Sequence, residues 1–182
     1  YNHQQSTQKS NKNPSELAER FPLIALFYEE LETTFAKDLL VFDDNIIFAQ
    51  NFFHVCADNN YYPNSGISSL GHAIPAAIGA GFANSLLTDS RFPSSLLTDS
   101  RFPNSLPTGD KTIFAVLGDG GFQMCCMEIM TAVNYQLPMT IVLLNNSSMG
   151  LIRKNQSQQY QQRYINCDFI NPDYELLSQS FG

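Results

Sequence analysis

The chain has 182 residues, 43% of them hydrophobic, which is enough to bury one genuine core, so a single domain is the default expectation. Ten Lys and Arg against seventeen Asp and Glu give a net charge of -7, which argues against a nucleic-acid partner held through its phosphates. No apolar run reaches the roughly 18 residues of a membrane span, and the four cysteines lack zinc-site spacing, so we expect a soluble, cytoplasmic protein with reduced cysteines.

The first part of the chain predicts a polar tail followed by helices around one short strand. Residues 1–13 are polar and lack periodicity, so we expect a flexible tail. Pro22 opens a helical pattern whose apolar residues recur every four positions, and this stripe is expected to pack on the core. The stripe consists of Leu23, Phe27, Leu31 and Phe35. Residues 39–42 predict a buried strand, residues 46–56 a second helix, and residues 58–66 a loop of turn-forming residues.

A run of small apolar residues from Leu70 predicts a tightly packed helix, with Pro75 in its first turn. It is followed by an internal duplication, in which the nine residues 85–93 recur at 95–103. Two copies of a polar unit are too few to build a solenoid. We therefore expect residues 84–110 to form an expanded surface loop without chemistry.

Beyond this loop, strands and helices alternate. Strands are predicted at 112–118 and 139–145, and helices at 122–135 and 151–156. Such a pattern makes adjacent parallel strands with right-handed crossovers. Residues 14–182 are therefore expected to form one α/β domain, a parallel sheet with helices on both faces.

Polar clusters follow both of these strands, Gly118 to Gly121 after the first and Asn145 to Ser148 after the second. Because ligands of open parallel sheets bind outside the carboxyl ends of the strands, we expect the clusters to lie side by side. Asp119 can offer a carboxylate oxygen, Asn146 an amide oxygen and Ser148 its carbonyl, which together suit Mg²⁺. A diphosphate would complete the metal's ligands, and the N–H groups of Gly120 and Gly121 would meet its charge.

The motif GDGGFQM…E…TAVNYQLP…VLLNN resembles the cofactor motif of thiamine diphosphate enzymes, most closely the acetolactate synthase and 2-oxo acid decarboxylase group. The resemblance runs from about Pro22 to Gly182. It implies the thiamine diphosphate-binding fold, with thiamine diphosphate and Mg²⁺ as cofactors. The residues that it places around the cofactor are Asn45, Ser68, Leu70, Gly118, Asp119, Gly120, Gly121, Asn146, Ser148 and Gly150.

The resemblance also assigns individual roles around the cofactor. The loop NSGISSLGHAIP matches the segment that cradles the aminopyrimidine. In that loop Leu70 matches the bulky residue that bends the cofactor, which brings its amine next to the reacting C–H group. On a local reading, the alternative for Leu70 is a core leucine at a helix start. Ser68 matches a position whose carbonyl meets the exocyclic amine, and Asn45 a region with a polar contact to the diphosphate.

Two positions depart from the family's pattern. His72 stands where the family usually has an aromatic residue, and a single histidine beside an apolar helix is expected to be packed rather than catalytic. Asn155 stands where acetolactate synthases have a tryptophan that selects the second substrate, and this chain contains no tryptophan. The second departure argues against a strictly biosynthetic acetolactate synthase.

The implied activity is decarboxylation and carboligation of 2-oxo acids, as part of a transferase or lyase. In the family a glutamate on a pyrimidine-binding domain activates the cofactor, and nothing in this chain matches that domain. Glu128 is not expected to replace it, so we assign no catalytic residue here, and the chain alone is expected to be inactive. The missing domain would come from the same longer chain or from another subunit of a homo-oligomer.

Two alternatives to this interpretation remain open. One is the small subunit of a split 2-oxo acid decarboxylase, and the other is a non-catalytic remnant that binds the cofactor. It begins at Tyr1 rather than Met, and relatives are expected to continue beyond Gly182 with another strand and helix.

Overall fold

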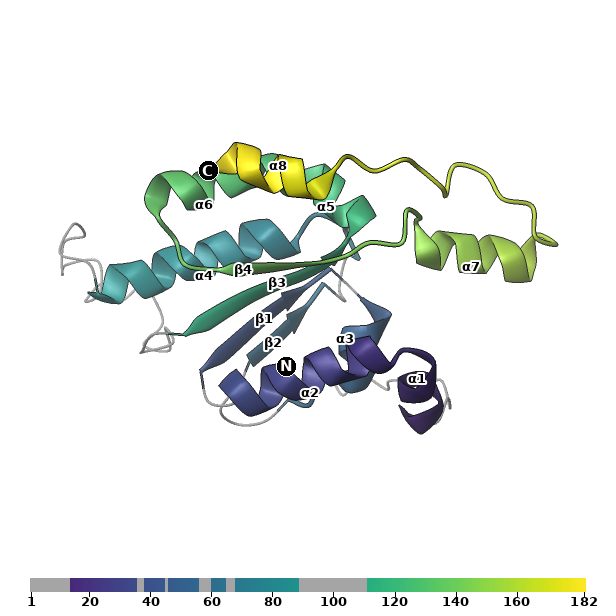
Figure 1. The fold of residues 1–182 in the computed structure, drawn as a ribbon, viewed down its shortest axis with the longest axis horizontal. Coiled ribbons are helices and arrows are strands. Elements are labelled where there is room, and N and C mark those ends of the chain that lie inside the picture. The colour runs from purple at the N-terminus through teal and green to yellow at the C-terminus, as the bar shows by residue number, and fades with distance from the viewer. Residues whose placement is uncertain (1–13, 36–37, 45, 56–59, 65–67, 89–110) are drawn as a thin grey trace, which may run out of the picture.

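The computed structural model describes residues 14–35, 38–44, 46–55, 60–64, 68–88 and 111–182 (Figure 1). Four strands are present in this part of the chain: β1 (Leu39–Asp43), β2 (Asn60–Pro63), β3 (Thr112–Gly118) and β4 (Thr140–Leu144). The helices that precede β3 are α1 (Pro14–Arg20), α2 (Pro22–Phe35), α3 (Ile47–Phe52) and α4 (Ala73–Thr88). Those that follow it are α5 (Asp119–Cys125), α6 (Ile129–Tyr135), α7 (Gly150–Gln159) and α8 (Tyr174–Phe181).

The four strands form one parallel sheet in the order β2-β1-β3-β4. Asp43 pairs with Val116 across β1 and β3, and Gly118 pairs with Leu144 across β3 and β4. All carboxyl ends therefore meet at one edge of the sheet, which we call the carboxyl edge. The predicted α/β class and the pairing of the two later strands are confirmed.

Side chains alternate between the two faces of the sheet, and each face has its own buried cluster. One face is covered by α4, α5 and α6, with α8 packed on the outside of α6, and the other face is covered by α2 and α3 (Figure 1). The first cluster receives the strand residues Leu40, Phe42, Ile113, Ala115 and Leu117. The second receives the intervening residues Leu39, Val41, Phe114 and Val116. Helices on both faces account for the almost continuously apolar β1 and β3.

The chain winds outward in opposite directions from the middle of the sheet. From β1 it passes through α3 to β2, whereas from β3 it passes through α5 and α6 to β4. The winding direction therefore reverses between β1 and β3. In open parallel sheets such a reversal leaves a crevice at the carboxyl edge, where ligands bind.

The predicted stripe on α2 is wrong in part. Leu31 is buried, but Leu23 is 80% exposed, and the second buried side chain of the helix is that of Tyr28. A spacing of four residues advances about 40° per step around a helix of 3.6 residues per turn, so a long row of such residues leaves the core face. The face of α2 that contacts the core is therefore narrower than the predicted row of apolar residues.

The loop predicted at 58–66 is also wrong in part, because residues Asn60–Pro63 form β2. The two tyrosines in its centre favour strands, while Asn60 and Pro63 are turn formers that hide this preference in the sequence. Pro63 is tolerated because β2 lies at the edge of the sheet and ends there.

The third difference concerns the helix after β3. It begins at Asp119 rather than after a DGG turn, and a 3₁₀ turn at Cys126–Glu128 separates α5 from α6. In addition, α4 continues to Thr88, so it includes the first residues of the duplicated segment. The tail 1–13 and residues 89–110 lie outside the described part of the chain.

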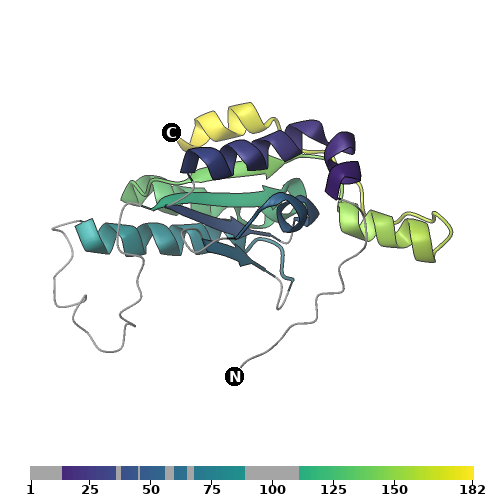
Figure 2. The ribbon, with the colours of Figure 1, turned by 90° about the horizontal axis from the view of Figure 1, so that it is seen from below.

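Helix α7, which follows β4, has no buried side chain. Both views place it beyond the carboxyl edge of the sheet, away from the two packed layers (Figures 1 and 2). Within the described ranges, no helix has the length and apolar character needed to cross a bilayer.

Candidate functional site

Asp119 forms the centre of the candidate site. It follows β3 directly, in the first turn of α5, and it is 1% exposed. Its Oδ2 accepts the Ser147 N–H at 2.6 Å, and its Oδ1 accepts the N–H of the adjacent Gly120 at 3.1 Å. The end of β3 and the end of β4 are therefore joined through this carboxylate, as the sequence predicts for Asp119 and the Asn145 to Ser148 cluster.

The segment after β4 folds into tight turns that present polar groups at the same edge. Ser147 has a φ of 54°, and its N–H also meets Asn145 Oδ1 at 3.1 Å. Asn146 is exposed, and its Oδ1 accepts the Ser148 N–H at 3.1 Å. Strained backbone of this kind is characteristic of functional sites.

Ser148 is fixed by an isolated antiparallel bridge to Asp168. The bridge is made by the Met149 N–H and the Ser147 carbonyl, so the carbonyl of Ser148 is not used in it. The Ser148 Oγ is buried and has no hydrogen-bond partner among the described residues.

Three glycines of the predicted site lie where a side chain would collide. A Cβ on Gly120 would approach Met149 Sδ at 2.7 Å, and one on Gly121 would collide with Asp44 Oδ2. A Cβ on Gly150 would lie 3.0 Å from Asn146 Nδ2. Gly120 and Gly121 are buried, and neighbouring side chains occupy the space that a Cβ would need, so only glycine fits at these two positions. Gly118, which precedes Asp119, caps α5.

Asp44 connects the end of β1 to the loop that precedes α4. It is 1% exposed, and its carboxylate accepts three N–H groups: Gly71 at 2.6 Å, His72 at 2.8 Å and Ala73 at 3.0 Å. Its own N–H donates to the Val116 carbonyl of β3 at 3.0 Å. This one side chain therefore caps α4 and holds the preceding loop against the carboxyl edge.

The loop held by Asp44 carries two predicted cofactor contacts. Leu70 lies in the turn before α4 and is 37% exposed, which rules out the alternative of a core leucine. Ser68 adopts a φ of 55°, and Gly71 a φ of 86°. Ser68 and Leu70 therefore directly precede the residues 71–73 whose N–H groups Asp44 holds. Asn45 lies outside the described residues.

Three buried carboxylates, Asp43, Asp44 and Asp119, gather at this edge. Asp43 accepts the Ile46 N–H at 2.9 Å and the Tyr61 hydroxyl at 2.7 Å, and burial followed by the charge of Asp43 raises the pKa of Tyr61. In the described part of the chain no lysine or arginine forms an ion pair with Asp119. Since an uncompensated buried charge is costly, this edge favours a cation.

The donor set at the edge fits a hard divalent cation. A carboxylate, an amide oxygen and a carbonyl are the ligands that Mg²⁺ prefers, and the unpartnered Ser148 Oγ adds a polar atom beside them. No group of three His, Cys, Asp or Glu that could hold a metal occurs among the described residues. Further oxygens would therefore come from a ligand, as in Mg²⁺ sites that include substrate phosphates.

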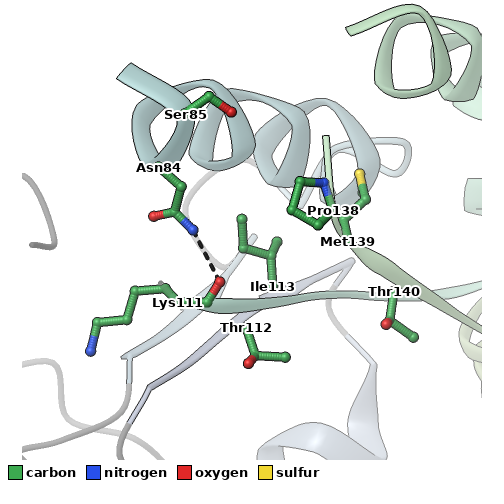
Figure 3. Close-up of a pocket in the computed structure, with 8 residues that line it drawn as sticks. All are labelled: Asn84, Ser85, Lys111, Thr112, Ile113, Pro138, Met139 and Thr140. Atoms are coloured by element: carbon green, nitrogen blue, oxygen red, sulfur yellow. Dashed lines mark hydrogen bonds between the residues drawn. The ribbon is translucent and has the colours of Figure 1, made fainter. Parts of the chain in front are cut away.

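A hollow of about 570 Å³ lies at the opposite edge of the sheet (Figure 3). It is lined by the end of α4 and by the starts of β3 and β4, and the Asn84 amide donates to the Lys111 carbonyl across it at 3.0 Å. It contains none of the predicted site residues, and a strand's length of core separates it from Asp119.

The remaining residues singled out in the sequence lie near the site without joining it. Burial raises the pKa of Cys125 to about 11, with the charge of Asp44 as the second cause, which agrees with an inert structural thiol. Glu128 is exposed and accepts the Thr131 hydroxyl at 3.3 Å. His72 is exposed as well, so the expectation of a packed histidine is wrong. Its backbone N–H donates to Asp44 Oδ1.

Sequence reasoning missed two residues that the structure places at the centre of the site, Asp44 and Asn171. The Asn171 amide donates to Asp119 Oδ2 at 2.7 Å, although 52 positions separate them. The sequence Asn171-Pro172-Asp173 signals a turn before a helix, and Asp173 does cap α8. Nothing local in either sequence context indicates the distant partner.

Known proteins match this chain in sequence and in structure. A family model described as thiamine pyrophosphate enzyme, C-terminal TPP binding domain, matches residues 44–182. The acetolactate synthase isozyme 2 large subunit of Escherichia coli K12 is 32% identical over 135 residues, which cover 74% of this chain and 20% of that protein. The acetolactate synthase large subunit of Lactococcus lactis is 30% identical over 132 residues, covering 67% of this chain and 19% of that protein.

The fold is shared with a solved structure. The thiamine diphosphate-dependent 4-hydroxybenzoylformate decarboxylase of Rhodococcus jostii RHA1 superimposes with a TM-score of 0.65 at 19% identity, covering 87% of this chain and 26% of that one. The chain thus spans about a fifth to a quarter of the length of the relatives it matches.

Proposed function

The chain belongs to the thiamine pyrophosphate enzymes, as a C-terminal TPP-binding domain of the acetolactate synthase-like group, and from that membership we propose that its carboxyl edge holds thiamine diphosphate through one Mg²⁺ ion. The observation that carries the proposal is the buried Asp119 carboxylate, which joins two strand ends without a cationic side chain. A metal ion would compensate its charge.

Each residue at the edge has a defined part in this proposal. Asp119, Asn146 and the Ser148 carbonyl would ligate the metal. The backbone of Gly118, Gly120 and Gly121 would face the diphosphate, and Gly150 would leave room for the Asn146 amide. Asn45 is proposed as a further polar contact to the diphosphate.

The loop before α4 would receive the other end of the cofactor. We propose that Ser68 offers its carbonyl to the aminopyrimidine amine and that Leu70 supports the bent conformation. Asp44 fixes this loop through three N–H groups, so the Leu70 turn is preorganised. When bound, thiamine diphosphate supplies the nucleophilic carbon that reacts with a 2-oxo acid.

We propose that the complete protein decarboxylates 2-oxo acids and joins the product to an acceptor, as a transferase or lyase. A pyrimidine-binding domain from the same longer chain or another subunit would contribute the activating glutamate, and a homo-oligomer would bring the two domains together. The chain's own part is to bind, orient and charge-balance the cofactor.

Replacing the central carboxylate tests the proposal. Asp119→Ala should weaken Mg²⁺-dependent thiamine diphosphate binding by more than about 100-fold, because losing a ligand costs more than losing one of its supporting partners. Asp119→Asn retains the shape but not the charge, and should weaken binding as well. Isothermal titration calorimetry in the presence and absence of Mg²⁺ gives both affinities.

The matched control is Asp38→Ala at the opposite edge of the sheet. Asp38 is exposed and pairs with Lys111 at 3.0 Å, an ion pair of at most about 1 kcal/mol, so this variant should bind the cofactor as the parent does. Equal affinity in the parent and both Asp119 variants would refute the site.

A further inference from the structure

The Asn171 side chain forms several hydrogen bonds beside the proposed metal site. It lies between α7 and α8, outside the segments that the sequence motif covers. Its Nδ2 donates to Asp119 Oδ2 at 2.7 Å and to Asn145 Oδ1 at 2.8 Å, and it lies 3.3 Å from Ser147 Oγ. One amide therefore contacts the ends of both β3 and β4.

Two donors fix which way this amide points. Asn171 Oδ1 accepts Gln123 Nε2 at 2.7 Å and the Tyr174 hydroxyl at 2.7 Å. Burial, with the charge of Asp119 as the second cause, raises the pKa of Tyr174. A flipped amide would place its oxygen against the Asp119 carboxylate, which can only accept hydrogen bonds when ionised, so the observed orientation is the one that satisfies Asp119.

The two oxygens of Asp119 are consequently unequal. Oδ2 accepts both Asn171 Nδ2 and the Ser147 N–H, at 2.7 and 2.6 Å. Oδ1 accepts only the longer bond from Gly120, at 3.1 Å, among the described residues. Two short hydrogen bonds occupy the lone pairs of Oδ2, which leaves Oδ1 as the oxygen available to a cation.

We propose that Asn171 is a positioning residue that restricts Asp119 to one metal-binding oxygen and thereby favours Mg²⁺ over Ca²⁺. This inference rests on the proposed metal site. Mg²⁺ requires near-octahedral geometry at short distances, whereas Ca²⁺ accepts more ligands and bidentate carboxylates. Holding Oδ2 in hydrogen bonds excludes the bidentate mode, and releasing it would favour the larger ion.

The test replaces the amide by a side chain of the same branching without polar atoms, Asn171→Leu. Mg²⁺ affinity, measured by calorimetry at a fixed concentration of thiamine diphosphate, should fall about 10- to 100-fold, as for other outer-shell partners of metal ligands. Ca²⁺ affinity should fall less, so the ratio of Mg²⁺ to Ca²⁺ affinity decreases. A merely structural role would lower the melting temperature and leave this ratio unchanged.

Two further variants keep the test decisive. Tyr174→Phe removes one of the donors that orient the amide while retaining the ring against Phe122, and should move the ratio in the same direction by a smaller amount. Asn134→Leu makes the same substitution at an exposed position of α6 and should change neither affinity.

The possible outcomes distinguish a failure of the proposed metal site from a failure of the role assigned to Asn171. A parent protein that binds neither cation would overturn the metal site and the inference with it. A parent that binds Mg²⁺, with an unchanged affinity ratio in Asn171→Leu and Tyr174→Phe, would overturn the role of Asn171 alone.

Discussion

At the scale of single residues, Gly121 shows how the site depends on the absence of a side chain. Its Cα faces the Asp44 carboxylate so closely that a Cβ would displace the Oδ2 atom, which holds the Gly71 N–H. Gly121→Ala should therefore lower the free energy of unfolding by about 1–3 kcal/mol, the usual cost of overpacking. Denaturant unfolding monitored by circular dichroism measures the change.

Gly79→Ala is the matched control for this prediction. Gly79 lies inside α4 with no atom within 4 Å of its virtual Cβ. The same substitution there should stabilise the protein by about 0.5–1 kcal/mol, because glycine is the poorer helix former. If the two variants changed stability in the same direction, the close approach of Asp44 to Gly121 would be wrong.

The site residues differ in how far the sequence predicts them. Asp119 and Asn146 are predictable because each directly follows an apolar strand, and parallel strands bring their ends together. Asp44 follows β1 in the same way, but its partners are 27 to 29 positions later. Asn171 contacts Asp119 only through the packing of α8, which no local pattern encodes. The predictions of metal ligation stay predictions.

At the scale of elements, two aspartates cap helices in contrasting surroundings. Asp44 caps α4 from a buried position, whereas Asp173 caps α8 at the surface, where its Oδ1 accepts the Glu175 and Leu176 N–H groups at 3.0 and 3.1 Å. Asp173→Ala should cost about 1 kcal/mol, the usual value of a cap. Asp44→Ala should cost more than about 2 kcal/mol, because it also leaves buried donors unpaired.

Thermal unfolding of both variants gives the comparison. A second measurement, amide hydrogen exchange, should show the loss of protection in Asp44→Ala concentrated in the first turn of α4 and the Gly71 segment. Equal losses of stability in the two variants would mean that burial of the Asp44 cap contributes nothing.

The elements were predictable where one physical signal dominates. Strands β1 and β3 read as apolar runs because both of their faces are covered, and α4 reads as a helix of small residues. Strand β2 escaped prediction because its ends are turn formers, and pairing with β1 overrides them. The exposed Leu23 of α2 shows the same limit, since tertiary contacts decide which part of an apolar row is buried.

At the scale of the whole molecule, the proposed site lies at the carboxyl edge, whereas the described residues that flank the duplicated segment lie at the opposite edge. Helix α4 ends, and β3 begins, at that opposite edge. Deleting residues 85–94 places Ser95 after Asn84, and residues 95–98 repeat the letters of 85–88. The last turn of α4 is thus restored, including the serine whose hydroxyl donates to the Gly81 carbonyl at 3.0 Å.

The shortened protein should keep its melting temperature and its affinity for thiamine diphosphate. Loop closure changes by only about 0.6 kcal/mol for each doubling of loop length, so removing ten residues from the connection has a small effect. Differential scanning calorimetry and cofactor titration check the two expectations. A loss of several degrees would show that the first copy packs on the core.

The position of the α4 terminus within the first copy also bears on how the gene can vary. Unequal recombination between the two copies adds or removes ten residues at a time, and every product delivers the same four letters to the end of the helix. A connection that is one copy shorter or longer should therefore leave the sheet and the carboxyl edge unchanged. A tandem repeat located at the carboxyl edge would not be tolerated in this way, because each added copy would displace Asp44 or Asp119 from its neighbours.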